Sequence, residues 1–358
     1  MARILVLYDK WMRENAEEMW RTAFEEARID NEHEVVYMEN VPGSYKWSSE
    51  VVDNVKEANG NPGYIKENIS GCIAVVSGYA PFTSEIMDAS EELEIIGISR
   101  GGPVNADHEA ATERGIRVLR AVGRNAESVA DQTMGFVISE SRLIARHSHE
   151  VKTGEYFKKL ESEGRPSYMG SFNWMELNGK TLGLVGYGQV GARVAKRAHA
   201  FGMNVIVYDP YIDARILEGE GCASVKLDNL LRDSDFISIH AKLTPETRHM
   251  INDQTLAKMK KTTVIINTAR GEIIDEEALY RALTNGVIAS AALDVFEVDP
   301  IRHDNPLIGL DNVTITPHSA GRSPDTEMRG YRQVALQVTA FLRGEEINPM
   351  YVSNKAVL

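Results

Sequence analysis

The sequence predicts an α/β protein made of two doubly wound domains, one inserted into the other. Short apolar runs alternate with helical patterns along the whole chain, which is typical of βαβ units and parallel sheets. The 358 residues are enough for two domains of roughly 150 residues each. Two long helical patterns flank the second series of strands, which indicates that the chain crosses twice between the domains.

The first series of strands fills the first third of the chain. The expected strands are 4–8, 34–37, 72–77, 94–98 and 116–119. Helical patterns at 14–27 and 83–89 lie between them, and the polar segment 40–68, with its prolines and glycines, is expected to be loop and irregular helix.

The second series contains six apolar runs of strand length, at 181–185, 204–208, 236–240, 263–266, 290–295 and 313–316. One long helix is expected over 125–147. A second is expected over 323–343, because it opens with Ser-Pro-Asp and stops at Gly344. We therefore expect a first domain of 1–148 completed by 323–358, and an inserted domain of 149–322.

Composition excludes several classes of protein. The 52 acidic and 39 basic residues give a formal net charge of −13, which argues against binding to a nucleic-acid backbone. No apolar run approaches the about 18 residues of a membrane span, and the first ten residues are better explained as a strand than as a signal peptide. Cys72 and Cys222 lie far apart without metal-ligand spacing. This is typical of a cytoplasmic protein with neither disulfide nor metal.

A dinucleotide fingerprint follows the first strand of the second series. Gly186, Gly188 and Gly191 form G-x-G-x-x-G between an apolar run and a helical pattern, and Asp209 ends the next strand. The glycines permit a tight turn, close approach of a pyrophosphate and close helix packing, while the Asp209 carboxylate accepts hydrogen bonds from ribose hydroxyls. That carboxylate repels a 2′-phosphate, which favours NAD over NADP. A glycine-rich turn with a solvated Asp is the alternative, and the combined context disfavours it.

Other ionisable residues follow the later strands of this series. Arg270 can clamp a carboxylate, the imidazole of His318 suits proton transfer, and Asp299 can orient that imidazole. Taken one at a time, each of these three residues is more simply explained as part of a surface ion pair or as a packed residue of a turn. Their place at successive strand ends, where ligands bind in open parallel sheets, favours a catalytic set. On the fingerprint helix, Arg193 and Arg197 are most simply its exposed face.

Several longer segments carry a family resemblance. They are 179–191, 201–211, 243–252, 267–279 with Asn-Thr-Ala-Arg-Gly, 291–297 and 316–321 with Thr-Pro-His-Ser-Ala-Gly. In these segments the chain resembles the D-isomer-specific 2-hydroxyacid dehydrogenases, almost continuously over 175–322 and more loosely at 110–116 and 123–131.

The resemblance implies a Rossmann NAD-binding domain inserted into a flavodoxin-like substrate domain. It implies an NAD-dependent oxidoreductase that interconverts a D-2-hydroxy acid and its 2-keto acid. The implied catalytic residues are Arg270, Asp299 and His318. The implied cofactor-binding residues are Gly186, Gly188, Gln189, Val190, Gly191, Asp209, Thr268, Ala269, Arg270, Asp294 and His318. Among these, Asp294 would hold the nicotinamide carboxamide.

The implied mechanism follows from the negative charge that develops on the substrate oxygen. His318 protonates the oxygen that becomes negative when hydride reaches the carbonyl carbon, and Arg270 binds the carbonyl and the carboxylate. Asp299 keeps the imidazole protonated and oriented. The chain departs from the family in having Asp rather than Glu at 299, and Glu297 is a rival for that role.

The segments expected to bind the substrate match the family less closely than the cofactor-binding segments do. Loop 99–107 is shorter than the family's carboxylate-binding loop, although Gly101 and Gly102 can still present N–H groups to an anion. Tyr79 either faces the substrate or packs structurally, Arg100 is a further candidate, and Lys242 replaces a common Pro. The expected substrate-binding residues are thus Tyr79, Gly101, Gly102 and Arg270.

Three alternatives to a general dehydrogenase exist on this fold. A phosphoglycerate dehydrogenase-type enzyme and a non-enzymatic NAD(H)-sensing regulator on the same fold both remain, whereas formate dehydrogenase is disfavoured because that branch carries Gln opposite the histidine. The expected partners are a small 2-hydroxy or 2-keto acid and a second copy of the chain, through 125–147 and 150–169, with no nucleic acid and no membrane.

Overall fold

The computed structural model describes residues 1–29, 32–48, 50–165 and 174–358. It divides the chain into two compact units. Unit 1 comprises Met1–Asn125 and Ser323–Leu358, and unit 2 comprises Ala126–Arg322. The division falls after Asn125 rather than at the expected 148, because the helix that follows packs within unit 2 against the fingerprint helix and two strands.

Unit 1 is built on a parallel five-stranded sheet in the order β2-β1-β3-β4-β5. Its strands are β1 (Arg3–Tyr8), β2 (Glu34–Glu39), β3 (Ala74–Ser77), β4 (Ile95–Ile98) and β5 (Arg117–Arg120). Its helices are α1 (Ala16–Ala27), α2 (Pro62–Ile69), α3 (Ser84–Met87), α4 (His108–Glu113) and α13 (Pro324–Leu342). The strands lie where the apolar runs predict them.

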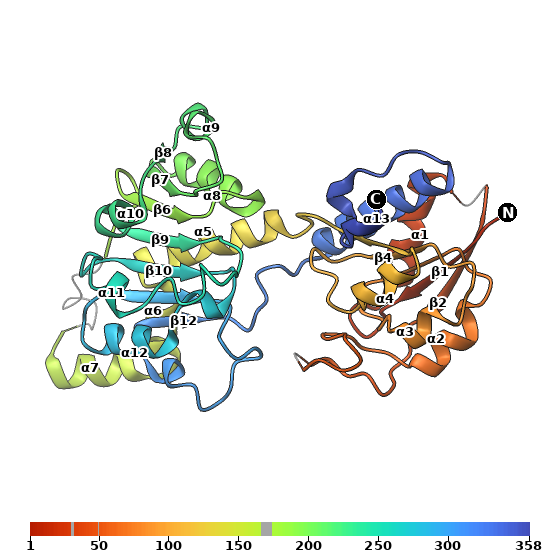
Figure 1. Cartoon of the computed structure of the whole chain (residues 1–358). Helices are drawn as coiled ribbons and strands as arrows, with labels where there is room; N and C mark the ends of the chain where they lie inside the picture. Colours follow the sequence, from red (N-terminus) through yellow and green to blue (C-terminus); the bar gives the residue numbers. More distant parts are fainter. Residues whose placement is uncertain (30–31, 49, 166–173) are drawn as a thin grey trace. The chain divides into compact units, whose positions relative to one another are not determined.

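Both faces of this sheet are covered. Alternate residues of β1 point to opposite faces, so Val6 packs with α1 and α13 whereas Leu7 packs with α2 and α3. The helix from the far end of the chain, α13, lies beside α1 (Figure 1). Tyr331 of α13 stacks on Trp20 of α1, with ring centroids 4.2 Å apart. The C-terminal segment therefore completes unit 1, which confirms a doubly wound fold.

Unit 2 is built on a parallel seven-stranded sheet in the order β12-β11-β10-β9-β6-β7-β8, visible as a stack of arrows in Figure 1. The strands are β6 (Thr181–Val185), β7 (Asn204–Tyr208), β8 (Ala223–Ser224), β9 (Phe236–Ile239), β10 (Val264–Asn267), β11 (Ser290–Leu293) and β12 (Val313–Ile315). Six of them were expected. The exposed two-residue edge strand β8 has no apolar run to predict it.

The helices of unit 2 lie on both faces of its sheet. They are α5 (Ala126–Arg142), α6 (Ile144–Thr153), α7 (Glu155–Glu163), α8 (Gln189–Ala200), α9 (Ala214–Gly219), α10 (Leu227–Asp233), α11 (Asp253–Leu256) and α12 (Glu276–Thr284). Phe236 of β9 packs in the core under α5 and α8, and its neighbour Ile237 packs in the core under α10–α12. None of the described helices is long and apolar enough to cross a membrane.

The single helix expected over 125–147 is wrong in one respect. The chain breaks between α5 and α6 at Leu143, which has φ of +54° and is almost fully buried. Arg146 in α6 donates to the buried Glu140 of α5 at 2.8 Å, so the break is held by an ion pair across it. The last long helix is as expected, since the Ser323 hydroxyl accepts from the Thr326 N–H at its start.

Candidate active site

The site in unit 2 forms where neighbouring parallel strands end. Strands β10, β11 and β12 lie side by side, and Arg270, Asp294 and His318 follow them in turn. Backbone hydrogen bonds tie these ends together. Asp294 N–H donates to the Asn267 carbonyl at 3.0 Å, and His318 N–H donates to the Asp294 carbonyl at 2.9 Å. The polar residues predicted from the strand ends therefore share one edge of the sheet.

The fingerprint turn has the geometry that the glycine pattern requires. Gly186 has φ of +97°, and a Cβ there would lie 2.8 Å from the Ala241 nitrogen. At Gly191 a Cβ would lie 2.5 Å from the Gly186 carbonyl oxygen, so α8 could not pack as closely. A Cβ at Gly188 would meet only open space, and no side chain caps the α8 N-terminus there. An uncapped helix start beside an open backbone fits a pyrophosphate.

Asp209 ties the end of β7 to this turn. Its Oδ2 accepts from the Tyr187 N–H at 2.8 Å, and its Oδ1 accepts from the Tyr211 N–H at 2.9 Å. Each carboxylate oxygen has a further lone pair that can accept from a ribose hydroxyl. The residue thus stands where the fingerprint expects an acid, with its orientation fixed by the backbone.

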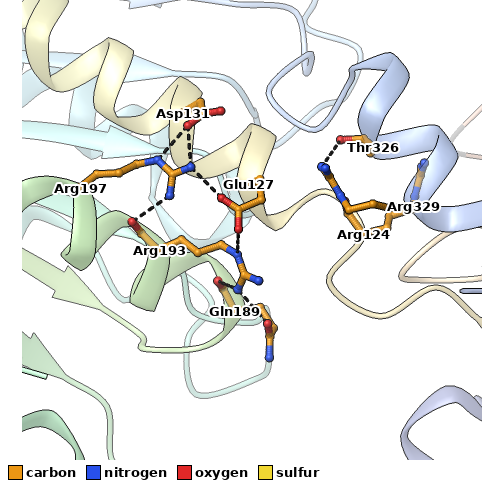
Figure 2. A network of polar contacts seen from close by, with 8 residues as sticks. All are labelled: Arg124, Glu127, Asp131, Gln189, Arg193, Arg197, Thr326 and Arg329. Atoms are coloured by element: carbon orange, nitrogen blue, oxygen red, sulfur yellow. Dashed lines mark hydrogen bonds and ion pairs between the residues drawn. The ribbon is translucent and has the colours of Figure 1, made fainter. Parts of the chain in front are cut away.

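The fingerprint helix is braced by α5 through an ion-pair network (Figure 2). Arg193 Nε donates to Glu127 at 2.6 Å, and Arg197 donates to Glu127 at 2.7 Å and to Asp131 at 2.8 Å. Arg193 also donates to the carbonyl of Gln189, at the first turn of α8. These arginines are therefore not simply an exposed face. Two acids and two arginines, each pair one helical turn apart, were the sequence signal for this pairing.

Arg270 carries a guanidinium that pairs with no acid among the described residues. Its turn is shaped by Asn267, whose side chain donates to the Arg270 carbonyl at 2.9 Å and accepts from the Ala269 N–H at 3.0 Å. Gly271 lets the turn approach the next loop, since a Cβ there would lie 1.9 Å from the Phe296 carbonyl carbon. Within the ranges that the structure describes, the exposed guanidinium donates only to the Ala269 carbonyl. It is available to an external carboxylate.

His318 pairs with Asp299 rather than with Glu297. The His318 Nδ1 contacts the Asp299 Oδ2, whereas the Glu297 carboxylate faces His249 at 2.9 Å and the N–H of Glu276 at 3.3 Å. His318 has φ of +53°, in the left-handed region that residues with side chains rarely adopt. Its side chain is about half exposed, at 48%. The geometry thus favours Asp299 over its rival as the carboxylate that orients the imidazole.

Asp294 holds the loop that carries His318. The carboxylate is buried and accepts from the Ser319 N–H at 2.9 Å, from the Ala320 N–H at 3.0 Å and from the Thr316 hydroxyl. The sequence did not predict this supporting role, because the bonds run between segments far apart in the chain. It exists alongside the predicted contact to a nicotinamide carboxamide.

Helix α5 also contacts the loops that follow β10 and β12. The Thr133 and Thr268 hydroxyls lie 3.1 Å apart, and the Ser128 hydroxyl donates to the Ala320 carbonyl at 2.8 Å. One helix therefore contacts the fingerprint helix, the Arg270 loop and the His318 loop. This arrangement explains why α5 belongs to unit 2.

A second histidine follows β9 but cannot serve as a neutral-pH acid. Burial lowers the pKa of His240 to about 3, and its Nε2 lies 2.9 Å from the Ser238 hydroxyl. The ring therefore stays neutral near pH 7. Of the strand-end histidines, His318 is the one with an exposed side chain and an acidic partner.

The remaining predicted residues belong to unit 1. Tyr79 is half-buried after β3 and packs edge-on against two tryptophans. Gly101 and Gly102 are exposed in the loop after β4. In unit 2, Lys242 is exposed beyond β9.

The doubly wound sheet, the fingerprint turn and the strand-end residues together define a dinucleotide-binding α/β enzyme. Residues 134–320 match the family model described as the D-isomer specific 2-hydroxyacid dehydrogenase, NAD binding domain. The chain belongs to this family of 2-hydroxyacid dehydrogenases, as the sequence resemblance predicted, and its cofactor is NAD or NADP.

Curated relatives and solved structures agree with this assignment. The D-3-phosphoglycerate dehydrogenase of Methanocaldococcus jannaschii is 40% identical over 82% of the chain, but this match spans only 55% of the relative's length. The hydroxypyruvate reductase of Thermotoga maritima is 42% identical over 72% of this chain and 80% of its own. The crystal structure of a glyoxylate reductase from Paecilomyes thermophila is 27% identical, with a TM-score of 0.72 over 97% of both chains.

Proposed function

We propose that the chain interconverts a D-2-hydroxy acid and its 2-keto acid with NAD, using His318 as the acid and base and Arg270 as the ligand of the substrate carbonyl and carboxylate. The pairing of His318 Nδ1 with Asp299, at the same sheet edge as the unpaired Arg270, is the observation that carries this proposal. It combines a titratable group, an orienting carboxylate and an anion ligand, which a hydroxy-acid oxidoreductase needs.

The chemistry of reduction divides among these groups. NAD in its reduced form supplies the hydride that adds to the carbonyl carbon. His318 donates a proton from Nε2 to the carbonyl oxygen, while Asp299 accepts from Nδ1 and fixes the orientation of the imidazole. Arg270 stabilises negative charge on the carbonyl oxygen and fixes the carboxylate through its planar fork. In oxidation, His318 Nε2 takes the hydroxyl proton.

The cofactor would be held by the backbone and by a few side chains. The α8 N-terminus at Gly188–Gly191, with Gln189 and Val190, would bind the pyrophosphate, and Asp209 the adenosine ribose. Thr268, Ala269 and Asp294 would line the nicotinamide side. Because the Asp209 carboxylate would repel a 2′-phosphate, we propose that NAD is preferred over NADP.

The test is NADH oxidation against a panel of 2-keto acids that includes glyoxylate, hydroxypyruvate and phosphohydroxypyruvate. Turnover with any of them is expected, and turnover with phosphohydroxypyruvate alone would favour a phosphoglycerate dehydrogenase-type enzyme. A non-enzymatic NAD(H)-sensing regulator would bind NADH, detected by its fluorescence, without oxidising it with any member of the panel. That result would contradict the proposal.

We also propose that the chain forms a homodimer through α6 and α7. Neither helix has a buried residue, although together they expose Ile144, Val151, Phe157 and Leu160. A second copy of the chain covering these side chains would remove them from water. The end of the predicted segment, 166–169, lies outside the described residues. Light scattering of the full chain should give twice the monomer mass.

A cytoplasmic location is proposed on the state of the cysteines. Cys72 and Cys222 are both unpaired and buried. Free thiols are typical of reducing compartments. Fractionation of the source cells would test this.

A further inference from the structure

Asp299 lies in a loop of unit 2 whose own backbone is held by few contacts. The loop comprises 297–305, after β11 and before the short helix η3 (Pro306–Gly309). In the part of the chain that the structure describes, no hydrogen bond between backbone groups joins 298–304 to a residue outside the loop. Within the loop, Ile301 packs against the core and Asp299 contacts His318. The position of the Asp299 carboxylate therefore depends on how the two ends of the loop are fixed.

The Glu276 side chain, at the first residue of α12, binds both ends of this loop. Its Oε1 accepts from the Glu297 N–H at 2.5 Å, and its Oε2 accepts from the Asn305 side chain at 2.9 Å. The Glu276 N–H in turn donates to the Glu297 carboxylate at 3.3 Å. One half-buried residue thus closes the loop at both ends.

The Glu297 end of the loop is held from a second side by His249. The His249 Nε2 lies 2.9 Å from the Glu297 carboxylate. His249 is itself fixed, because its N–H donates to the Glu272 carbonyl at 2.9 Å and its carbonyl accepts from the Asn252 side chain at 2.9 Å. The Glu297 carboxylate is therefore oriented by groups from two segments, the one before α11 and the start of α12.

The segment that leads into α12 also carries Arg270. Arg270 precedes Glu276 in the same short connection between β10 and the helix. Gly271 lets this connection lie against the loop, because a Cβ there would lie 2.4 Å from the Glu297 nitrogen. Glu276 thus joins the connection that carries Arg270 to the loop that carries Asp299.

The start of α12 does not depend on the Glu276 side chain. Asp275 caps the helix, since its carboxylate accepts from the Ala278 N–H at 2.9 Å. The next residue, Glu277, has a side chain that is 91% exposed and lies 3.8 Å from Arg281. Because Glu276 and Glu277 share the first turn, both carboxylates interact with the helix dipole. Replacement of Glu277 is therefore a matched control for replacement of Glu276.

We propose that Glu276 is a positioning residue for the reaction, which holds the 297–305 loop so that the Asp299 carboxylate meets the His318 Nδ1. This inference rests on the proposed function, because it takes His318 as the group that transfers the proton. Misplacement of a catalytic group by about 1 Å can cost about 10²-fold in rate. Loss of the contacts at both ends of the loop therefore lowers the rate of the chemical step, whereas the fingerprint turn after β6 keeps its structure.

The first experiment separates kcat from cofactor binding. NADH oxidation at saturating 2-keto acid is compared for the wild type, Glu276→Ala, Glu276→Gln and the control Glu277→Ala. We expect Glu276→Ala to lose about tenfold in kcat, with an NADH affinity within about twofold of the wild type. Glu276→Gln keeps an oxygen for the Glu297 N–H but presents an amide to Asn305, so it should lose less. Wild-type kcat in Glu276→Ala, or an equal loss in Glu277→Ala, would overturn the proposal.

A double-mutant cycle tests whether Glu276 acts through Asp299. In the Asp299→Ala background, Glu276→Ala should cost less than about twofold in kcat, because the carboxylate that Glu276 positions is absent. The same tenfold loss in both backgrounds would contradict the proposal, since it would assign Glu276 to the fold or to another group.

The third experiment needs no turnover. Long-range ¹H–¹⁵N spectra of the full chain, labelled at histidine, report the Nδ1 signal of His318, which is assigned with His318→Ala. Asp299→Ala should move this signal, Glu276→Ala should move it in the same direction, and Glu277→Ala should leave it in place. An unmoved signal in either of the first two variants would contradict the proposal. If thermal unfolding shows that Glu276→Ala is not folded, Glu276→Gln decides on the same criteria.

The two proposals fail in different ways. If the wild-type chain oxidises NADH with no 2-keto acid, the proposed function is wrong, and the histidine spectra still test whether Glu276 holds Asp299 on His318. If the wild type turns over and Glu276→Ala matches it in kcat and in the spectra, the positioning role alone is wrong.

Discussion

Replacement of His318 by Ala tests the assignment of the acid and base. The change removes the imidazole and leaves Asp299 without its partner. The side chains of His318 and Asp299 are 48% and 36% exposed, so the free energy of unfolding should change by less than about 1 kcal/mol. The loop itself stays anchored, because the Asp294 carboxylate accepts from the backbone N–H groups of the next two residues, Ser319 and Ala320. A large loss of activity would therefore reflect chemistry and not unfolding.

The expected loss in kcat is about 10²–10⁴-fold, the usual contribution of a positioned proton donor. This corresponds to about 3–5 kcal/mol of activation free energy. The assay is NADH oxidation at saturating 2-keto acid, with NADH binding measured by fluorescence and thermal unfolding recorded for each variant. His303→Ala, an exposed histidine of the same unit, is the matched control and should retain wild-type turnover. A His318→Ala enzyme within threefold of wild-type kcat would refute the assignment.

Further predictions concern Arg270, the cofactor site and Asp9. Arg270→Lys keeps the positive charge but loses the planar guanidinium that binds a carboxylate through two N–H groups, so kcat/KM should fall at least about tenfold. The control Arg215→Lys, at an exposed surface arginine, should leave kcat/KM unchanged. Equal losses in the two variants would contradict the role of Arg270. Glu127→Gln removes the charged partner that Arg193 and Arg197 share, and it should weaken NADH binding several-fold. Glu109→Gln is the control. Unchanged NADH affinity in Glu127→Gln would show that this ion-pair network does not support the cofactor site. Asp209→Asn should raise kcat/KM with NADPH relative to kcat/KM with NADH. An unchanged ratio of the two values would show that Asp209 does not determine the cofactor preference. Burial raises the pKa of Asp9 from its ordinary value of 3.8 to about 6 in the folded protein. The unfolded chain therefore ionises first, and stability should fall by up to about 3 kcal/mol as pH rises from about 4 to 6. Denaturant unfolding of Asp9→Asn should lack this decrease, and parallel pH profiles for the two proteins would contradict it.

Most of the fold could be predicted because buried parallel strands carry their signal locally. The apolar runs located both sheets except β8, whose two exposed residues have no such signal. The Ser323 cap and Gly344 stop located α13. The break at Leu143 could not be predicted, because Leu143 adopts a left-handed conformation that only tertiary contacts impose. The compact units divide after Asn125 and not at the expected 148, since α5 packs on α8.

The candidate site, like the fold, could be predicted from the sequence only in part. Arg270, Asp299 and His318 were predicted as a set because strand ends in a parallel sheet share an edge. The structure places Arg270 and His318 after neighbouring strands and pairs His318 with Asp299, and their catalytic roles stay predictions. The supporting role of Asp294 was not visible, since its carboxylate bonds depend on the path of the His318 loop.

The most direct measurement is a crystal structure of the full chain with NAD⁺ and oxamate, an unreactive mimic of a 2-keto acid. We expect the His318 Nε2 within hydrogen-bonding distance of the oxamate carbonyl oxygen, its Nδ1 on Asp299, and the guanidinium of Arg270 on the carboxylate. An imidazole directed into bulk solvent, or an arginine remote from the bound acid, would contradict the proposed division of roles.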